Sequence, residues 1–118
     1  LDIILVKGNH DILQDDWYTD AGIEVIKESY TVSNFSFIHD IADSSSIQAG
    51  SYFFSGHMHP GISIKGMGKQ SMQLPCFYFT ASYCVLPAFS RFTGTYGVTP
   101  AKNETVFAIA ENRILQLQ

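Results

Sequence analysis

The stretch FFSGHMHPG at residues 53–61 places two histidines one residue apart, between an apolar run and a Pro-Gly turn. The apolar run predicts a buried strand, and Pro60-Gly61 predicts a loop. His57 and His59 are therefore expected at the end of a strand, where open α/β sheets carry their ligand sites. Gly56 has no Cβ, so we expect it to let backbone or a metal ion come close.

The composition bounds the class of protein. A chain of 118 residues with 46% hydrophobic content forms at most one domain with a core of its own. Its net charge of −4 supplies no general attraction for nucleic acid, although a pair of bound metal ions would reverse the sign locally. No apolar run is long enough to span a membrane. Cys76 and Cys84 lie in apolar surroundings, which predicts two buried, reduced thiols and a cytoplasmic location.

The order of expected elements is rich in strands. Residues 1–7 are nearly all apolar, as in a central strand that is covered on both faces. Because no turn or cap precedes this run, we expect the chain to be the C-terminal portion of a longer protein. Residues 14–21 predict a short helix or loop, residues 41–50 a short helix or polar loop, and residues 87–100 a long ordered loop. Further strands are expected at residues 23–26, 29–32, 35–39, 52–55, 62–65, 73–80, 83–86, 105–110 and 113–117.

Polar side chains that suit metal or phosphate chemistry follow several of these strands. They are Asn9, His10, Asp11, His39, His57 and His59, and they include all four histidines of the chain. Histidine nitrogen and carboxamide oxygen suit Mn²⁺, Fe or Zn²⁺, while two cysteines are too few for an all-thiolate zinc site. Taken singly, most of them have simpler interpretations. The segment after the first strand could be a plain turn, Asp11 a helix cap, and His39 a half-buried structural histidine.

The joint order of these motifs resembles the calcineurin-like metallophosphoesterase superfamily. The pattern of that superfamily is Asp-x-His, Gly-Asp-x-x-Asp, Gly-Asn-His-Asp/Glu, a lone His and Gly-His-x-His. The last three are present as Gly8-Asn9-His10-Asp11, His39 and Gly56-His57-Met58-His59. The first two are absent, so residues 1–118 are interpreted as the C-terminal portion of a single metallophosphoesterase domain.

Further stretches are similar to the bacterial metallophosphoesterases that are associated with a DNA ligase and a DEXH-box helicase. They are LVKGNHD at residues 5–11, GIEV at 22–25, KGMGKQ at 65–70, LPCF at 74–77 and LPAFSRFTG at 86–94. The chain departs from that family at Asp40-Ile41, where Glu-Pro is common. The resemblance implies an α/β fold, the four-layer αββα sandwich, of which this chain is the strand-rich C-terminal part.

The resemblance also implies a division of roles among the candidates. Asn9, His39 and His57 would bind one divalent metal ion and His59 a second, with Mn²⁺ expected first and Fe, Zn²⁺ or Mg²⁺ as alternatives. His10 would act on the phosphoryl oxygens or the leaving group, and Asp11 would orient His10. The activity would be phosphodiester hydrolysis by a water that bridges two metal ions. The 118-residue chain by itself would be inactive, because the ligands of the first two motifs are absent.

Substrate and partners follow less directly. Lys65, Lys69 and Arg91 could hold a nucleic-acid backbone or could simply be solvated surface charges. The aromatic rings of residues 89, 92 and 96 could stack on bases, but core positions beneath the long loop are the favoured interpretation. A nuclease that acts on DNA in repair, with helicase and ligase partners, is the main hypothesis. The alternatives are a phosphomonoesterase or cyclic-nucleotide phosphodiesterase, and a non-catalytic scaffold for a helicase and ligase complex.

Overall fold

The computed structural model describes residues 1–46, 50–66, 68 and 70–118. The expected class is confirmed, since the chain is a mixed α/β structure in which strands dominate. A two-stranded parallel sheet joins β1 (Ile3–Val6) to β2 (Ile23–Ile26), and the short helix α1 (Asp15–Asp20) lies between them in sequence. The remaining strands form a long sheet, and the two sheets share no backbone ladder in the described part of the chain.

The long sheet has the order β11-β10-β7-β8-β5-β4-β3; β6 branches from β7, and β9 pairs with β6. Its strands are β3 (Ser29–Val32), β4 (Phe35–Ile38), β5 (Tyr52–Ser55), β6 (Pro60–Lys65), β7 (Ser71–Phe79), β8 (Tyr83–Val85), β9 (Tyr96–Gly97), β10 (Thr105–Ala110) and β11 (Arg113–Gln116). A 3₁₀ helix, η1 (Ile41–Ser46), follows β4. Most predicted strands are confirmed within one or two residues. The expected long loop at residues 87–100 also contains the short strand β9.

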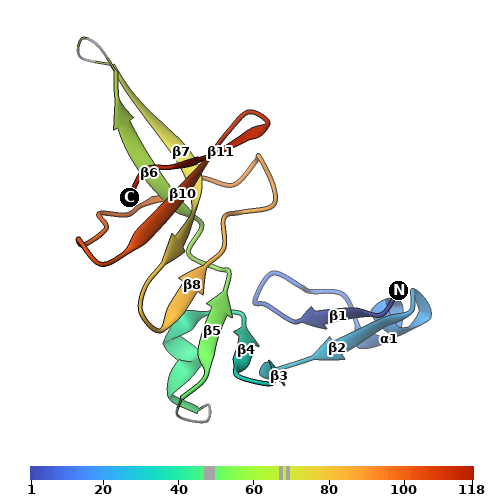
Figure 1. Cartoon of the computed structure of the whole chain (residues 1–118). Coiled ribbons are helices and arrows are strands. Elements are labelled where there is room, and N and C mark those ends of the chain that lie inside the picture. Colours follow the sequence, from blue (N-terminus) through green and yellow to red (C-terminus); the bar gives the residue numbers. More distant parts are fainter. Residues whose placement is uncertain (47–49, 67, 69) are drawn as a thin grey trace.

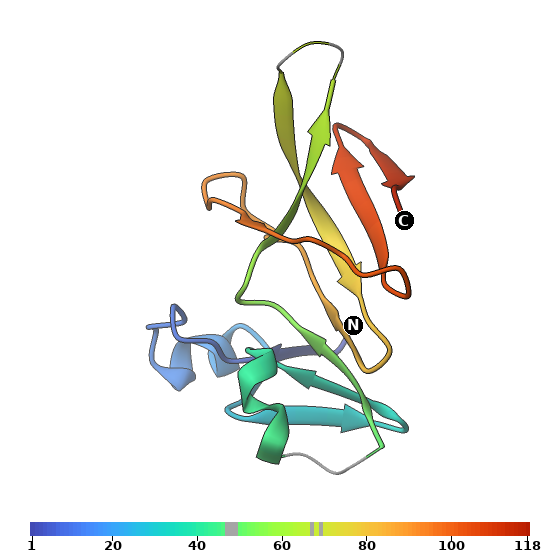
Figure 2. The same ribbon diagram turned by 90° about the vertical axis from the view of Figure 1, so that its left-hand side faces the viewer.

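The molecule is elongated, with extents of 52 × 32 × 24 Å. Figure 2 shows the β6–β7 hairpin and the β10–β11 pair at one end, and η1 with the β1–β2 pair at the other. The end of β5 lies between these regions (Figure 1). The histidine motif after β5 is therefore near the middle of the chain's long dimension.

The apolar first strand has fewer neighbours than its sequence predicts. β1 pairs only with β2 in the described structure, and Ile3 is 47% exposed. The expectation of a central strand covered on both faces is thus wrong for this chain. The described part of the chain supplies no second strand beside β1, and α1 buries none of its residues. Asp15 of α1 instead pairs with Lys7 and Lys27, which directly follow β1 and β2. Lys7 donates to Asp15 at 2.6 Å and Lys27 lies 3.2 Å from it, which holds the pKa of the Asp15 carboxyl below its ordinary value.

A small core lies between β7 and β10. Cys76, Val106 and Ala108 are fully buried and pack with Ile62, Leu74, Tyr78 and Val98. Cys76 and Cys84 are both free and buried, as expected, and burial raises the pKa of each thiol to about 11. Among the described residues, no helix has the length and apolar character that crossing a lipid bilayer requires.

The core predicts unequal effects for two valines. Val106→Ala removes two methyl groups from a fully buried site and should lower the free energy of unfolding by about 2 kcal/mol. Val32→Ala is the matched control, because Val32 is 48% exposed on β3 and should change stability by well under half of that amount. Urea unfolding followed by circular dichroism measures both. Equal losses would contradict the location of the core.

Candidate metal centre

Parallel pairing of two strands brings the lone histidine beside the histidine pair. β4 and β5 run parallel with Ile38 opposite Ser55. The Gly56 N–H continues this ladder by donating to the His39 carbonyl at 3.1 Å. His39 therefore leaves the sheet next to the turn that carries His57. The rings of these two histidines meet edge to face, with centroids 4.8 Å apart.

The close approach of His39 to the turn after β1 depends on Gly8. A Cβ at Gly8 would overlap Cε1 and Nδ1 of the His39 ring, so any larger residue there would force the ring to shift. The absence of a side chain at Gly8 therefore makes room for an imidazole. Gly56, by contrast, would place a Cβ in ordinary contact, 4.0 Å from the His39 carbonyl oxygen.

Three side chains meet at one nitrogen atom. His39 Nε2 lies 2.8 Å from Asn9 Oδ1 and 2.9 Å from His57 Nδ1. An imidazole nitrogen carries either one hydrogen or one lone pair, so Nε2 cannot donate to one neighbour and accept from the other. Hydrogen bonding alone therefore satisfies this group of three side chains only partly. A cation, in contrast, would accept one lone pair from each of the three atoms.

The distances suit such a cation. With bonds of about 2.1 Å, neighbouring ligand atoms lie roughly 3.0 Å apart around an octahedral ion and roughly 3.4 Å apart around a tetrahedral ion. The two separations in the structure, 2.8 and 2.9 Å, are closer to the octahedral spacing. Within the described ranges no group of three or more His, Cys, Asp and Glu side chains is arranged to hold a metal ion. The third donor of this cluster is the Asn9 amide oxygen.

Backbone strain marks the turn after β5. His57 and His59 both have positive φ angles, 61° and 52°. This left-handed region is uncommon for residues other than glycine and is concentrated at functional sites. The alternation expected on an extended chain does not apply here, so the two rings are not forced onto opposite faces of a strand.

His59 is half-buried, and its known contact is made by its backbone: the carbonyl accepts a hydrogen bond from the Tyr96 N–H at 2.8 Å. No hydrogen bond joins its ring to the Asn9–His39–His57 cluster in the described structure. Its role at a second metal ion stays a prediction.

The turn after β1 exposes His10 and fixes Asp11. The Asp11 carboxylate accepts a hydrogen bond from the Gly8 N–H at 2.7 Å, and the Asp11 N–H donates to the Gly8 carbonyl at 3.2 Å. Asp11 therefore holds the turn that carries Asn9. The expected bond between Asp11 and His10 is not present among the described residues. The His10 side chain is exposed to solvent.

Asp40 is a site residue that the sequence interpretation missed. Its Oδ2 lies 3.5 Å from His57 Nε2, while its Oδ1 accepts a hydrogen bond from the Ala42 N–H at 3.0 Å. A carboxylate at the second nitrogen of a histidine is the usual means of fixing the ring orientation and tautomer of a metal ligand. The sequence signal for this role is the position of Asp40 directly after His39, at the end of a strand. In the family comparison Asp40-Ile41 is only a departure from the common Glu-Pro.

Two of the basic residues predicted to contact substrate form no side-chain bond with this cluster. Lys65 is exposed at the end of β6, and Arg91 is exposed in the loop after β8. Neither of these two makes an ion pair with a described residue. Lys69 lies outside the described residues.

Comparison with known proteins gives a class first. No protein-family model matches the chain, and no curated protein sequence matches it. Its fold is nevertheless similar to that of a solved nuclease, which supports a nuclease- or phosphoesterase-like fold. That structure is the Pseudomonas putida nuclease MPE, which matches with a TM-score of 0.78 and 27% sequence identity over 99% of this chain and 54% of the nuclease. The chain thus spans about half the length of the nuclease.

The space at Gly8 generates a test of the cluster. Gly8→Ala should displace the His39 ring and separate it from Asn9 and His57, because the new methyl group would overlap the ring. Gly56→Ala is the matched control beside the same histidine, since its Cβ meets only ordinary contact. Nuclear magnetic resonance of ¹⁵N-labelled histidine side chains reports the outcome. Unchanged His39 signals in Gly8→Ala would show that the close approach does not exist in solution.

Proposed function

We propose that this chain contributes one metal site to a metal-dependent phosphodiesterase that acts on nucleic acid. The observation that supports it most directly is the convergence of Asn9 Oδ1 and His57 Nδ1 on His39 Nε2, in a chain with the fold of a nuclease. Asn9, His39 and His57 would hold one divalent ion, with Mn²⁺ expected first. A divalent ion held there would lower the pKa of bound water and neutralise charge on phosphoryl oxygens.

The chain's own residues prepare this site. Asn9 is neutral, so it leaves more net positive charge for a phosphate than a carboxylate ligand would. The Asp40 carboxylate lies 3.5 Å from Nε2 of His57 and would favour a hydrogen on that nitrogen, which would leave Nδ1 as the metal-facing atom. Asp11 holds the turn through the Gly8 N–H and keeps Asn9 in place. Through these contacts, the turn after β1 and the turn after β5 would hold the same metal ion.

His10 is proposed to act on the substrate rather than on the metal. It is adjacent to Asn9 but exposed, so its ring can reach a bound phosphodiester. An imidazolium N–H would donate a hydrogen bond to a phosphoryl oxygen and pass its proton to the leaving oxygen. The same proposal has three further parts, which rest on the family resemblance. They are action on DNA in repair, binding of a second ion by His59, and helicase and ligase partners.

Metal titration separates the ligands from His10. Asn9→Ala, His39→Ala and His57→Ala should each weaken Mn²⁺ binding by roughly 10-fold or more, because each removes a donor from the same ion. His10→Ala is the matched control and should bind Mn²⁺ as the unmodified chain does. Isothermal titration calorimetry measures each affinity. Loss of metal binding in His10→Ala would make His10 a ligand and overturn the assignment.

Hydrolysis tests the activity itself. The intact gene product should cleave a chromogenic phosphodiester and DNA only when Mn²⁺ or a similar ion is present. The 118-residue chain alone should not, because the family pattern requires Asp-x-His and Gly-Asp-x-x-Asp as well. Full turnover by the 118-residue chain would show that these additional ligands are not needed. Metal-independent hydrolysis by the gene product would sink the proposal.

A further inference from the structure

The long loop between β8 and β9 is fastened at both ends to the histidine turn. At its start, the Leu86 N–H donates to the Ser55 carbonyl at 2.7 Å. At its end, the Tyr96 N–H donates to the His59 carbonyl at 2.8 Å. The loop therefore leaves the sheet just before His57 and returns just after it. Figures 1 and 2 both place this loop on the same side of the long sheet as the turn after β1.

The returning end of the loop is closely packed. A Cβ at Gly61 would lie 2.7 Å from the Thr95 side chain, so the loop meets β6 without space between them. The Val98 N–H then donates to the Gly61 carbonyl at 2.9 Å. Within the loop, Ser90 accepts a hydrogen bond from the Phe92 N–H through its hydroxyl and another from Thr93 through its carbonyl. The loop is an ordered element with fixed ends.

Two aromatic rings of this loop have no cover. Phe89 and Phe92 have relative exposures of 106% and 101%, and Tyr96 has 66%. The interpretation of these rings as core beneath the loop is therefore wrong, and the physical reason is that the loop faces solvent instead of folding over the sheet. Two fully exposed phenylalanines three residues apart form an apolar surface that gains free energy from any planar apolar partner.

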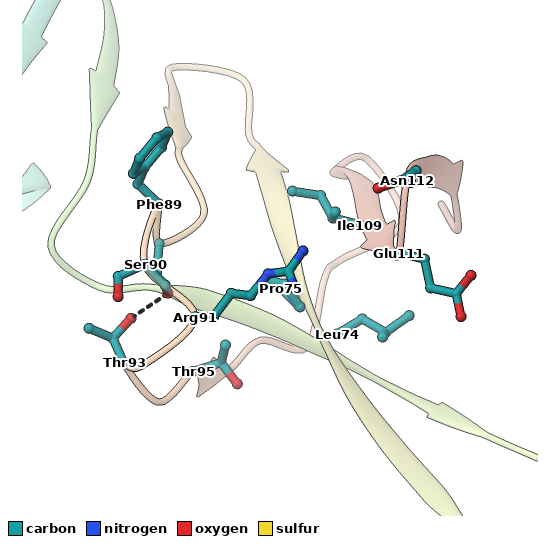
Figure 3. Close-up of a pocket in the computed structure, with 11 residues that line it drawn as sticks. Leu74, Pro75, Phe89, Ser90, Arg91, Thr93, Thr95, Ile109, Glu111 and Asn112 are labelled. Atoms are coloured by element: carbon teal, nitrogen blue, oxygen red, sulfur yellow. Dashed lines mark hydrogen bonds between the residues drawn. The ribbon is translucent and has the colours of Figure 1, made fainter.

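A cation lies between the two rings in sequence. Arg91 lines an open cavity of about 630 Å³ together with Leu74, Pro75 and Ile109. Figure 3 shows its side chain extending toward Pro75, whereas the Phe89 ring points away from that strand. Arg91 forms no hydrogen bond or ion pair with any residue in the described ranges. Glu111 also lines this cavity, but its carboxylate is not paired with Arg91.

The exposed rings on the long sheet differ from those of the loop. Phe35 and Phe37 are 48% and 36% exposed, and both rings pack against Phe54. They form one face of a sheet, which another layer of polypeptide would cover. Phe89 and Phe92 lie instead on a loop whose two ends are hydrogen-bonded to the segment that carries His57 and His59, and they flank an arginine in sequence. A strand of nucleic acid, which alternates planar bases with phosphates, matches that order of ring, cation and ring.

We propose that Phe89 and Phe92 bind unstacked nucleobases of the substrate and that Arg91 binds a neighbouring phosphate. The proposal rests on the nuclease function proposed above and adds to it the residues that bind the strand beside the metal site. Stacking on aromatic side chains tolerates any base, whereas the arginine attracts the backbone. The loop would thereby compensate for a chain whose net charge of −4 repels nucleic acid in general.

Fluorescence anisotropy in EDTA tests this binding without hydrolysis. The probes are a fluorescein-labelled oligothymidylate and an abasic oligonucleotide of the same length. The gene product should bind the oligothymidylate more tightly than the abasic strand. Phe89→Ala and Phe92→Ala should each weaken binding of the oligothymidylate by about fivefold or more and reduce the preference for bases. Arg91→Ala should weaken binding of both strands and lower its salt dependence.

Trp17→Ala is the matched control for loss of an exposed aromatic ring. Trp17 is 68% exposed on α1, among Asp15, Asp16 and Asp20, whose charges repel phosphate. Its removal should leave both affinities unchanged. Equal affinity for thymidylate and abasic strands, or no effect of Phe89→Ala and Phe92→Ala, would overturn the proposal and favour a polypeptide at these rings.

Failure of the proposed nucleobase site is distinguishable from failure of the proposed metal-dependent function. Base-dependent binding with no Mn²⁺ affinity would overturn the metal site alone, and Mn²⁺ affinity with base-independent binding would overturn the nucleobase site alone.

Discussion

The contact of the His39 ring with Gly8 is the constraint on which the site depends. The β1–β2 pair and the long sheet are not joined by backbone hydrogen bonds in the described structure. Their meeting point is the imidazole that occupies the space where a side chain of residue 8 would lie. A shallow hollow lined by Ile4, Val6, Tyr30 and Phe37 accompanies this contact. Without the close approach, Asn9 would have no fixed relation to His57.

Local patterns predicted most of the strands, because alternation and turn residues are properties of a few neighbouring positions. The bounds of β2, β3, β5 and β10 agree with those expected from the sequence. Contacts between distant residues were harder to predict. The role of Gly8, the position of Asp40 beside His57 and the exposure of Phe89 all depend on how separate segments pack. The motif order predicted that Asn9, His39 and His57 act together, yet only packing shows that Asn9 Oδ1 and His57 Nδ1 both lie within hydrogen-bonding distance of His39 Nε2.

The turn after β5 has two unfavourable backbone conformations that the surrounding hydrogen bonds hold in place. Left-handed angles at His57 and His59 cost of order 1–3 kcal/mol each, so the surroundings must hold them. The hydrogen bonds from the Gly56 N–H, the Leu86 N–H and the Tyr96 N–H surround this turn on three sides. Rigidity of this kind favours a site that receives a ligand in a preset geometry, since less freedom is lost on binding.

The elongated shape of the molecule has a consequence for its surface. A compact monomer of 13.1 kDa would expose about 6,400 Å², whereas this chain exposes 8786 Å². The excess, about 2,400 Å², falls in the size range of permanent subunit interfaces. One part of the exposed apolar surface lies on β1, β3 and β4, at Ile3, Val32, Phe35 and Phe37. A polypeptide layer seated there would lower the local dielectric around the His39 cluster, and the charges of a bound ion and a phosphodiester would then attract each other more strongly than they do on an open surface.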